Sequence, residues 1–228
     1  MLKEIVRGIK PRYLIITPLK FDDKISSNTK ITIKRNKVPF SWYSYQSDGN
    51  VVENFVKGME KSLKLFKTCP KYIIKVDNDT TWNRKTLDNM YYCLEKSKDN
   101  VAYTYCGFEF SGAVNQKFPF HPFIPERLQQ GNYISSNSMF KINILKKYKP
   151  ITNQKYKRLL DWAYYLHLLN NGYIGQPCKG YFVADTKPSS ISAGNAEEYK
   201  TIFERVKKDF IDVRGKCENL IMYDDKNF

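Results

Sequence analysis

Apolar and polar segments alternate regularly along the first half of the chain. Short runs rich in Ile, Val and Tyr, which are typical of buried strands, occupy residues 13–17, 40–45, 72–76 and 101–106. Between these runs, apolar side chains at helical spacing predict helices over residues 25–36, 51–66 and 84–98. Strands that alternate with helices favour a mostly parallel, Rossmann-like sheet flanked by helices, so we predict an α/β fold.

The second half of the chain is less regular. Its Phe- and Pro-rich residues 116–125 predict an ordered loop, and residues 132–141 combine apolar alternation with Ser and Asn. Helical spacing predicts a helix over residues 158–171, which Gly172 ends, and an amphipathic helix over residues 196–214. A strand begins at Phe182 and passes into a loop that reaches Ser192. No repeat or low-complexity linker divides the chain, so we expect a single domain over residues 1–228.

Composition and charge narrow the classes of partner. The 228 residues are 42% hydrophobic and 15% aromatic, which predicts a folded protein rather than a disordered one. The formal net charge of +15 favours anionic partners such as nucleotides, phosphorylated glycans, nucleic acid or an anionic membrane face. The basic residues are scattered and form no block of five, so no basic tail is indicated.

Cysteine and histidine usage argues against two structural classes. The five cysteines are an odd number without a Cys-x-x-Cys pair, and the chain has two histidines. This pattern disfavours both a structural zinc site and a disulfide scaffold, and reduced cysteines fit a cytoplasmic protein. The N-terminus has no apolar signal core, and no apolar run approaches the length of a membrane span. Peripheral contact with an anionic membrane stays open.

The strand over residues 72–76 ends in two carboxylates. Asp77 and Asp79 are one residue apart and are therefore expected to leave the strand tip on the same side. Carboxylates placed so close repel each other unless a cation lies between them, and Mg²⁺ or Mn²⁺ commonly joins such groups to substrate phosphates. The alternative is that the two residues open a turn or cap a helix. Polar segments also follow the other strands at Pro18 and Asp48, and in open parallel sheets ligands bind at this edge.

Four segments together resemble the family 2 glycosyltransferases of the GT-A fold. They are Thr17-Pro18 after the first strand, Asp48-Gly49 after the second, residues 77–82 (Asp-Asn-Asp-Thr-Thr-Trp) and residues 160–172, which begin Leu-Asp-Trp. The resemblance implies transfer of a sugar from a nucleotide-diphosphate donor to a glycan, glycolipid (lipid-linked) or protein-linked acceptor, with inversion and metal assistance. It implies a nucleotide-sugar-binding half over residues 1–106 and an acceptor-binding half over residues 107–228 that contains the C-terminal helix.

The resemblance also implies site residues. Asp161 is the catalytic base, although a carboxylate at a helix N-terminus is also favoured by the helix dipole alone. Asp77 and Asp79 hold a Mn²⁺ or Mg²⁺ ion. The nucleotide sugar is expected to contact Thr17, Pro18, Asp48, Asn50, Asp77, Asn78 and Lys187.

Several departures from the family pattern keep other functions open. Leu160 stands where the family often has a Glu, and Lys187 stands where it commonly has a metal-binding His before a Ser-x-Ser, here Ser190-Ile191-Ser192. These changes favour, as an alternative, a nucleotide-sugar-binding protein without transfer activity. The net charge permits a nucleic-acid-binding module, but the chain has no basic stripe or nucleic-acid motif, so no nucleic-acid partner is expected. A nucleotidyltransferase with a similar sheet is a further alternative.

Overall fold

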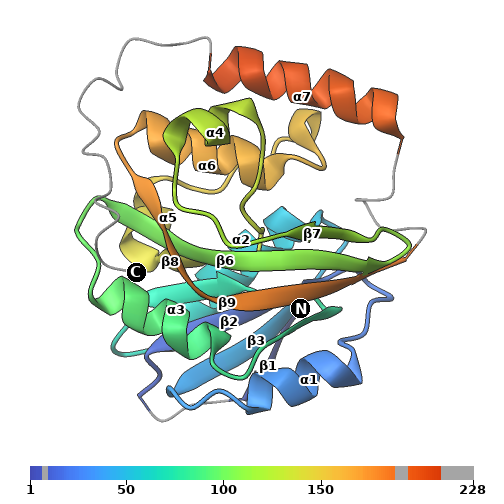
Figure 1. The fold of residues 1–228 in the computed structure, drawn as a ribbon. Coiled ribbons are helices and arrows are strands. Elements are labelled where there is room, and N and C mark those ends of the chain that lie inside the picture. Colours follow the sequence, from blue (N-terminus) through green and yellow to red (C-terminus); the bar gives the residue numbers. More distant parts are fainter. Residues whose placement is uncertain (7–9, 188–194, 212–228) are drawn as a thin grey trace.

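The computed structural model describes residues 1–6, 10–187 and 195–211, which form a curled sheet flanked by helices (Figure 1). The strands are β1 (Leu2–Val6), β2 (Tyr13–Leu19), β3 (Phe40–Gln46), β4 (Tyr72–Lys75), β5 (Thr80–Trp82), β6 (Val101–Gly112), β7 (Gln116–Phe118), β8 (Met139–Lys141) and β9 (Ile174–Thr186). The helices are α1 (Ser27–Lys34), α2 (Val51–Leu63), α3 (Thr86–Glu95), α4 (Pro125–Gln130), α5 (Ile142–Lys147), the 3-10 turn η1 (Gln154–Tyr156), α6 (Leu160–Asn170) and α7 (Ala196–Phe210).

The sheet is mixed rather than mostly parallel as the sequence predicted. Its strand order is β1-β3-β2-β4-β8-β6-β9-β5, with β7 paired to β6. Strand β2 pairs in parallel with β3 and β4, and β6 pairs in parallel with β9. The other described pairings, including β4 with β8, are antiparallel. The α/β fold class is confirmed, and the one sheet joins strands from both halves of the chain.

The central parallel strands explain where a site can form. Every residue of β2 is buried, as are all four residues of β4, which matches their apolar sequences. Tyr13 pairs with both Phe40 and Tyr72, so β2, β3 and β4 start at one edge of the sheet and end at the other. The loops after these three strands therefore lie side by side at the carboxyl edge.

The start of helix α2 and the end of helix α6, two helices close to the site, are each set by neighbouring residues in the sequence. Helix α2 starts at a capping box, in which the Asn50 side chain accepts the Glu53 N–H and the Glu53 side chain accepts the Asn50 N–H. Helix α6 ends before Gly172, whose φ of +80° belongs to the left-handed region that glycine adopts most easily. Trp162 and Tyr165 of α6 are buried, and Figure 1 shows α4, α6 and α7 as a layer over β6.

The structure adds elements that the pattern did not predict. The short strands β1 and β5 were not expected, and β7 lies inside the predicted loop 116–125. Helix α7 is described as far as Phe210, and Ser190-Ile191-Ser192 lie outside the described residues. None of the described helices is long and apolar enough to cross a membrane.

Candidate functional site at the carboxyl edge of the sheet

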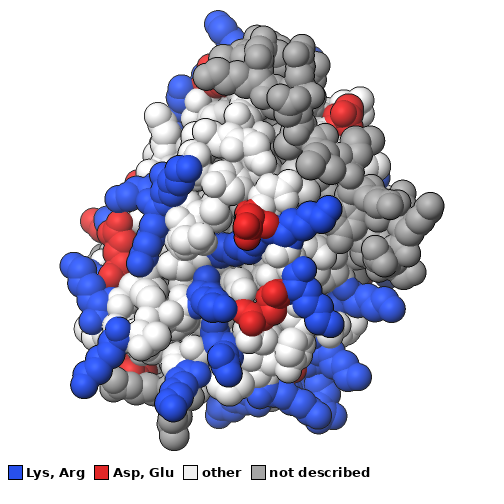
Figure 2. All heavy atoms as spheres, turned by 90° about the vertical axis from the view of Figure 1, so that its left-hand side faces the viewer, with Lys and Arg blue, Asp and Glu red and all other residues white. Residues whose placement is uncertain are grey.

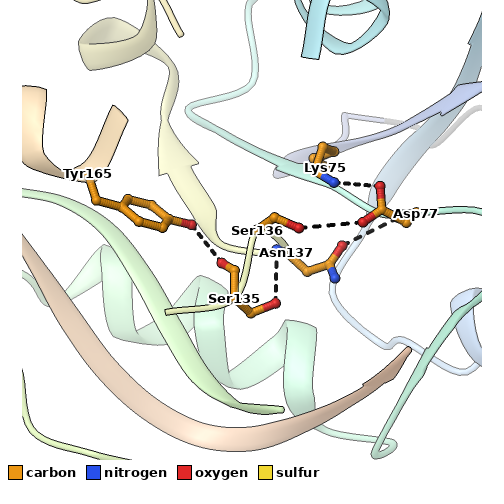
Figure 3. Close-up of polar contacts among 6 residues, drawn as sticks. All are labelled: Lys75, Asp77, Ser135, Ser136, Asn137 and Tyr165. Atoms are coloured by element: carbon orange, nitrogen blue, oxygen red, sulfur yellow. Dashed lines mark hydrogen bonds and ion pairs between the residues drawn. The ribbon is translucent and has the colours of Figure 1, made fainter. Parts of the chain in front are cut away.

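Asp77 lies at the centre of a polar network just after β4 (Figure 3). The Lys75 Nζ lies 2.5 Å from its Oδ1 atom, and the Ser136 hydroxyl lies 3.5 Å from its Oδ2 atom. The backbone N–H of Asp77 donates to Oδ1 of Asn137 at 3.3 Å. Both carboxylate oxygens of Asp77 thus have a partner from the protein itself.

Lys75 is a buried cation that the sequence analysis did not single out. Its side chain is only 10% exposed, whereas that of Asp77 is 28% exposed. A buried ammonium needs a partner because the loss of hydration costs several kcal/mol. The positive charge of Lys75 also lowers the pKa of Asp79 and of Asp161, so its ammonium is within electrostatic range of both carboxylates. Lys75 therefore links the strand-tip pair to the start of α6.

Asp79 is a half-buried carboxylate that the negative charges of neighbouring residues repel. Burial, followed by the negative charge of Asp77, raises its pKa from 3.8 to about 6, and Asp185 adds to the effect. Asp185 lies near the end of β9, where its N–H donates to the Asp79 carbonyl at 3.2 Å. A bound cation beside Asp79, in addition to the Lys75 ammonium, would therefore stabilise its ionised form.

Asp161 opens helix α6 and faces the same polar region. Its Oδ1 accepts the Trp162 N–H at 2.9 Å, and its Oδ2 accepts the Asn132 side-chain amide at 3.1 Å. Burial raises the pKa of Asp161, while these hydrogen bonds and the Lys75 charge oppose the rise. The carboxylate is thus held in one orientation and made more basic, which are two requirements for a general base.

A buried hydrogen-bond chain fixes α6 against the loop that contacts Asp77. The Tyr165 hydroxyl donates to the Ser135 carbonyl at 2.6 Å, and the Ser135 hydroxyl accepts the Asn137 N–H at 3.1 Å (Figure 3). Ser136 and Asn137 in turn contact Asp77. The loop of residues 135–137 therefore connects helix α6 to the turn that carries Asp77. The Ser- and Asn-rich segment noted in the sequence therefore supports the candidate site through hydrogen bonds.

The residues predicted to contact the nucleotide occupy different environments. Thr17 is fully buried, and its hydroxyl accepts the Trp42 indole N–H at 3.0 Å; Pro18 is buried beside it in β2. Asp48 is exposed in the turn after β3. Asn50 caps α2, and its side-chain amide donates to the Thr152 carbonyl at 3.4 Å. Thr17 and Asn50 thus already have structural partners.

Asn78 lies between the two carboxylates in the sequence, and Lys187 follows the end of β9. The Asn78 carbonyl accepts the Ser26 N–H at 2.8 Å and the Thr29 hydroxyl at 3.1 Å, which ties the strand-tip loop to the start of α1. Lys187 is exposed and follows β9, two residues beyond Asp185. The structure therefore brings the loop of residues 77–79 next to the end of β9.

The donor set fits a divalent ion only in part. Among the described residues, no group of three or more His, Cys, Asp or Glu side chains gathers as a metal site. Two carboxylates, Asp77 and Asp79, are available, and Mg²⁺ in enzymes is often held by one or two carboxylates together with substrate phosphates. The residues therefore suit an ion that arrives with a diphosphate, with Asp79 as the carboxylate that needs a cation more.

Sequence reasoning missed three contributors to this site. Lys75 carried a signal, because a charged residue inside an apolar strand two positions before Asp77 shares its face of the strand. Asp185 and Asn132 carried none, since each reaches the site only through the tertiary fold. Trp42 and Trp82 are buried in the core.

Comparison with known proteins places this geometry in context. No protein-family model and no curated protein matches the chain. It is similar to the structure of S. aureus TarS 1–349 in complex with UDP, with a TM-score of 0.56 and 13% identity over 86% of this chain and 64% of that one. The complex of the same protein with UDP-GlcNAc has a TM-score of 0.56 and 13% identity over 83% and 64%.

A second similar structure is that of a mannosyltransferase. The mannosyltransferase PcManGT from Pyrobaculum calidifontis, in complex with GDP-Man and Mn²⁺, has a TM-score of 0.50 and 12% identity over 89% of this chain and 71% of that one. The chain spans 39% of the longer TarS structure. At such low identity the similarity establishes the fold: the chain has the mixed α/β fold of these glycosyltransferase structures.

Proposed function

We propose that this chain is a glycosyltransferase that moves a sugar from a nucleotide-diphosphate donor to a glycan, a lipid-linked glycan or a glycosylated protein. The observation that carries the proposal is the ion pair between the buried Lys75 and Asp77 at the end of β4, whose ammonium is within electrostatic range of both Asp79 and Asp161. Support also comes from the fold, which is similar to structures that hold UDP, UDP-GlcNAc and GDP-Man.

The proposed donor side consists of the strand-tip loop. When the glycosidic bond breaks, its electron pair leaves with the nucleoside diphosphate, and the negative charge that develops must be neutralised. Lys75 is a fixed positive charge at this point, and Lys187 follows the adjacent end of β9. A Mn²⁺ or Mg²⁺ ion bound by Asp79, with Asp77 as second carboxylate, would add charge stabilisation of the departing diphosphate.

The proposed acceptor side is the start of α6. Asp161 takes the proton from the acceptor hydroxyl as its oxygen forms a bond to the anomeric carbon. Attack from the face opposite the leaving diphosphate inverts the configuration of the sugar. Asn132 and the Trp162 N–H orient the carboxylate, and burial raises its pKa and thus its strength as a base.

The organisation of the chain follows from the same proposal. The donor is expected to bind the part contributed by residues 1–106, including Asp48 and the loop after Pro18. The acceptor is expected to bind the part contributed by residues 107–228, to which Asp161 belongs. We propose a cytoplasmic location, with peripheral contact at an anionic membrane face where the acceptor is lipid-linked.

Thermal unfolding with UDP, GDP, CDP and dTDP, each with and without Mn²⁺, tests the donor side. A ligand that binds the native state raises the melting temperature by mass action, so one nucleotide is expected to stand out. Asp79→Ala is expected to lose that shift. Its matched control is Asp99→Ala, which removes an exposed carboxylate in the turn before β6 and is expected to leave the shift unchanged. No shift with any nucleotide would remove the basis of the proposal.

The alternative of a nucleotide-sugar-binding protein without transfer activity has one observation in its favour. Lys75 and Ser136 already occupy both oxygens of Asp77, which leaves this carboxylate less available to a metal ion that would assist transfer. Release of free nucleoside diphosphate from the matching nucleotide sugar separates the two functions. A transferase releases it, and Asp161→Asn slows release by about 100-fold or more while donor binding persists. Binding without release in the unmodified protein supports the alternative.

A further inference from the structure

A pocket lies at the edge of the sheet opposite the strand-tip carboxylates. It is an open pocket of about 650 Å³ whose lining includes Arg12, Lys37, Arg84, Lys85, Tyr91 and Tyr92. Arg12 immediately precedes β2 and Lys37 shortly precedes β3, so this amino-edge groove lies where the parallel strands begin. Strand β2 spans seven residues, which separates the groove from the strand-tip carboxylates by roughly 20 Å.

The groove has a strong excess of positive charge. Arg12, Lys37, Arg84 and Lys85 are all exposed, and within the described residues none of them forms an ion pair with an acidic side chain. Figure 2 looks onto the side of the molecule where α3 lies and shows Lys and Arg as the dominant charged residues on it. Four cations from three separate segments of the chain line the same pocket. A surface whose lysines and arginines served only solubility would not need to bring them together.

The one acidic side chain in the lining is already used. Asp88 is buried, and its carboxylate accepts the Lys37 N–H at 3.1 Å and the Val38 N–H at 3.0 Å. These bonds hold the loop before β3 in place and partly satisfy the negative charge. The four cationic heads are thus left facing solvent around a fixed floor.

Aromatic residues complete the groove. Tyr92 is 54% exposed, which is unusual for so large a side chain, and Tyr91 forms part of the wall. Tyr91 is held in place by core packing, since its ring centroid lies 6.3 Å from that of the buried Tyr13. Cations with Tyr rings and hydroxyls suit an anionic group that carries an organic portion.

We propose that the amino-edge groove binds phosphate esters, separately from the proposed donor site. Arg12 and Arg84 offer planar guanidinium forks that match phosphate oxygens, and Lys37 and Lys85 add point charges. Such a group can come from the headgroup of an anionic phospholipid or from a soluble phosphorylated molecule. A single hollow of about 650 Å³ suits a small phosphate ester, whereas a nucleic-acid strand needs a continuous basic track.

The test compares two variants with the same change in net charge. Arg84→Glu/Lys85→Glu reverses two groove charges; both side chains are exposed and precede α3, where acidic residues favour the helix dipole, so folding is expected to persist. Lys64→Glu/Lys67→Glu reverses two exposed charges outside the groove. Binding is measured to phosphatidylglycerol vesicles, to phosphatidylcholine vesicles and to soluble glycerol phosphate, at fixed salt.

The expected result is binding to phosphatidylglycerol vesicles or glycerol phosphate that falls about tenfold or more in the groove variant and less than twofold in the control. Vesicle binding identifies a lipid headgroup, and binding of glycerol phosphate alone identifies a soluble ligand. Equal losses in both variants mean unspecific charge attraction and overturn the proposal. The proposal is also overturned if neither phosphatidylglycerol vesicles nor glycerol phosphate binds, or if single-stranded RNA binds and phosphate esters do not. Nucleotide-induced thermal shifts are expected to be unchanged in the groove variant, so this test and that of the transferase fail independently.

Discussion

Replacing Asp79 by Asn should make the ligand-free protein more stable at neutral pH although it removes a proposed ligand-binding group. Asp79 is half-buried beside the negative charges of Asp77 and Asp185, which oppose its ionisation. Asn has nearly the same shape and no charge. The substitution therefore removes the electrostatic cost and leaves the packing almost unchanged.

The size and pH range of the effect follow from the raised pKa of Asp79. Its change from 3.8 to about 6 is a shift of about 2 pH units, at about 1.4 kcal/mol each, which sets a ceiling of about 3 kcal/mol. Asp79 is partly exposed, so solvent screening reduces this to about 1–2 kcal/mol. Because the folded state keeps the proton to higher pH than the unfolded state, the native protein loses stability as pH rises from about 4 to about 6. Asp79→Asn lacks this loss, so it should be more stable at pH 7.5 and equal to the native protein near pH 4.

Urea unfolding at pH 4, 5, 6 and 7.5, followed by fluorescence of the buried Trp42 and Trp162, measures the difference. Asp48→Asn, which neutralises an exposed carboxylate, is the control and should change little at any pH. If Asp79→Asn is less stable at pH 7.5, or if its advantage does not depend on pH, the electrostatic reasoning is wrong. A stabilised variant that also loses nucleotide binding would mark Asp79 as a residue whose charge serves function at the expense of stability.

Three further predictions concern the frame around the sites. Lys75→Met should lower the free energy of unfolding by about 1–3 kcal/mol because it leaves Asp77 without its partner, and adding Asp77→Asn should restore most of the loss. Urea melts of the four proteins give the coupling energy, and a value below about 0.5 kcal/mol would show that the pair does not form. Asp88→Ala should cost about 2–4 kcal/mol by leaving the Lys37 and Val38 amides without an acceptor, and amide hydrogen exchange at these two residues should accelerate. Tyr165→Phe should cost about 1–2 kcal/mol through the lost bond to the Ser135 carbonyl. An unchanged midpoint of denaturation would show that water replaces this bond.

Several residues of the candidate site could be predicted from the sequence because each belongs to a short segment whose pattern spans only a few positions. The spacing of Asp77 and Asp79 is fixed by the sequence, and Asp161 lies near the start of a helix that apolar spacing predicts. Asp77 and Asp79 lie in the turn just after β4 rather than on the strand itself, and Asp161 is the second residue of α6. Their chemical roles stay predictions until nucleotide binding and transfer are measured.

The sequence by itself determined which segments become β2, β3, β4, α2 and α6, since apolar periodicity and capping residues act over a few positions. It did not determine the mixed pairing of the sheet, because β6 pairs with β9 across more than 60 residues and the three-residue β5 is a strand only where β9 supplies its partner. The tertiary structure also decided that Lys75 serves both Asp77 and the surroundings of Asp161, and that Asp185 faces Asp79. Charge effects of this kind depend on distance and burial in space, and neither quantity can be read from spacing along the chain.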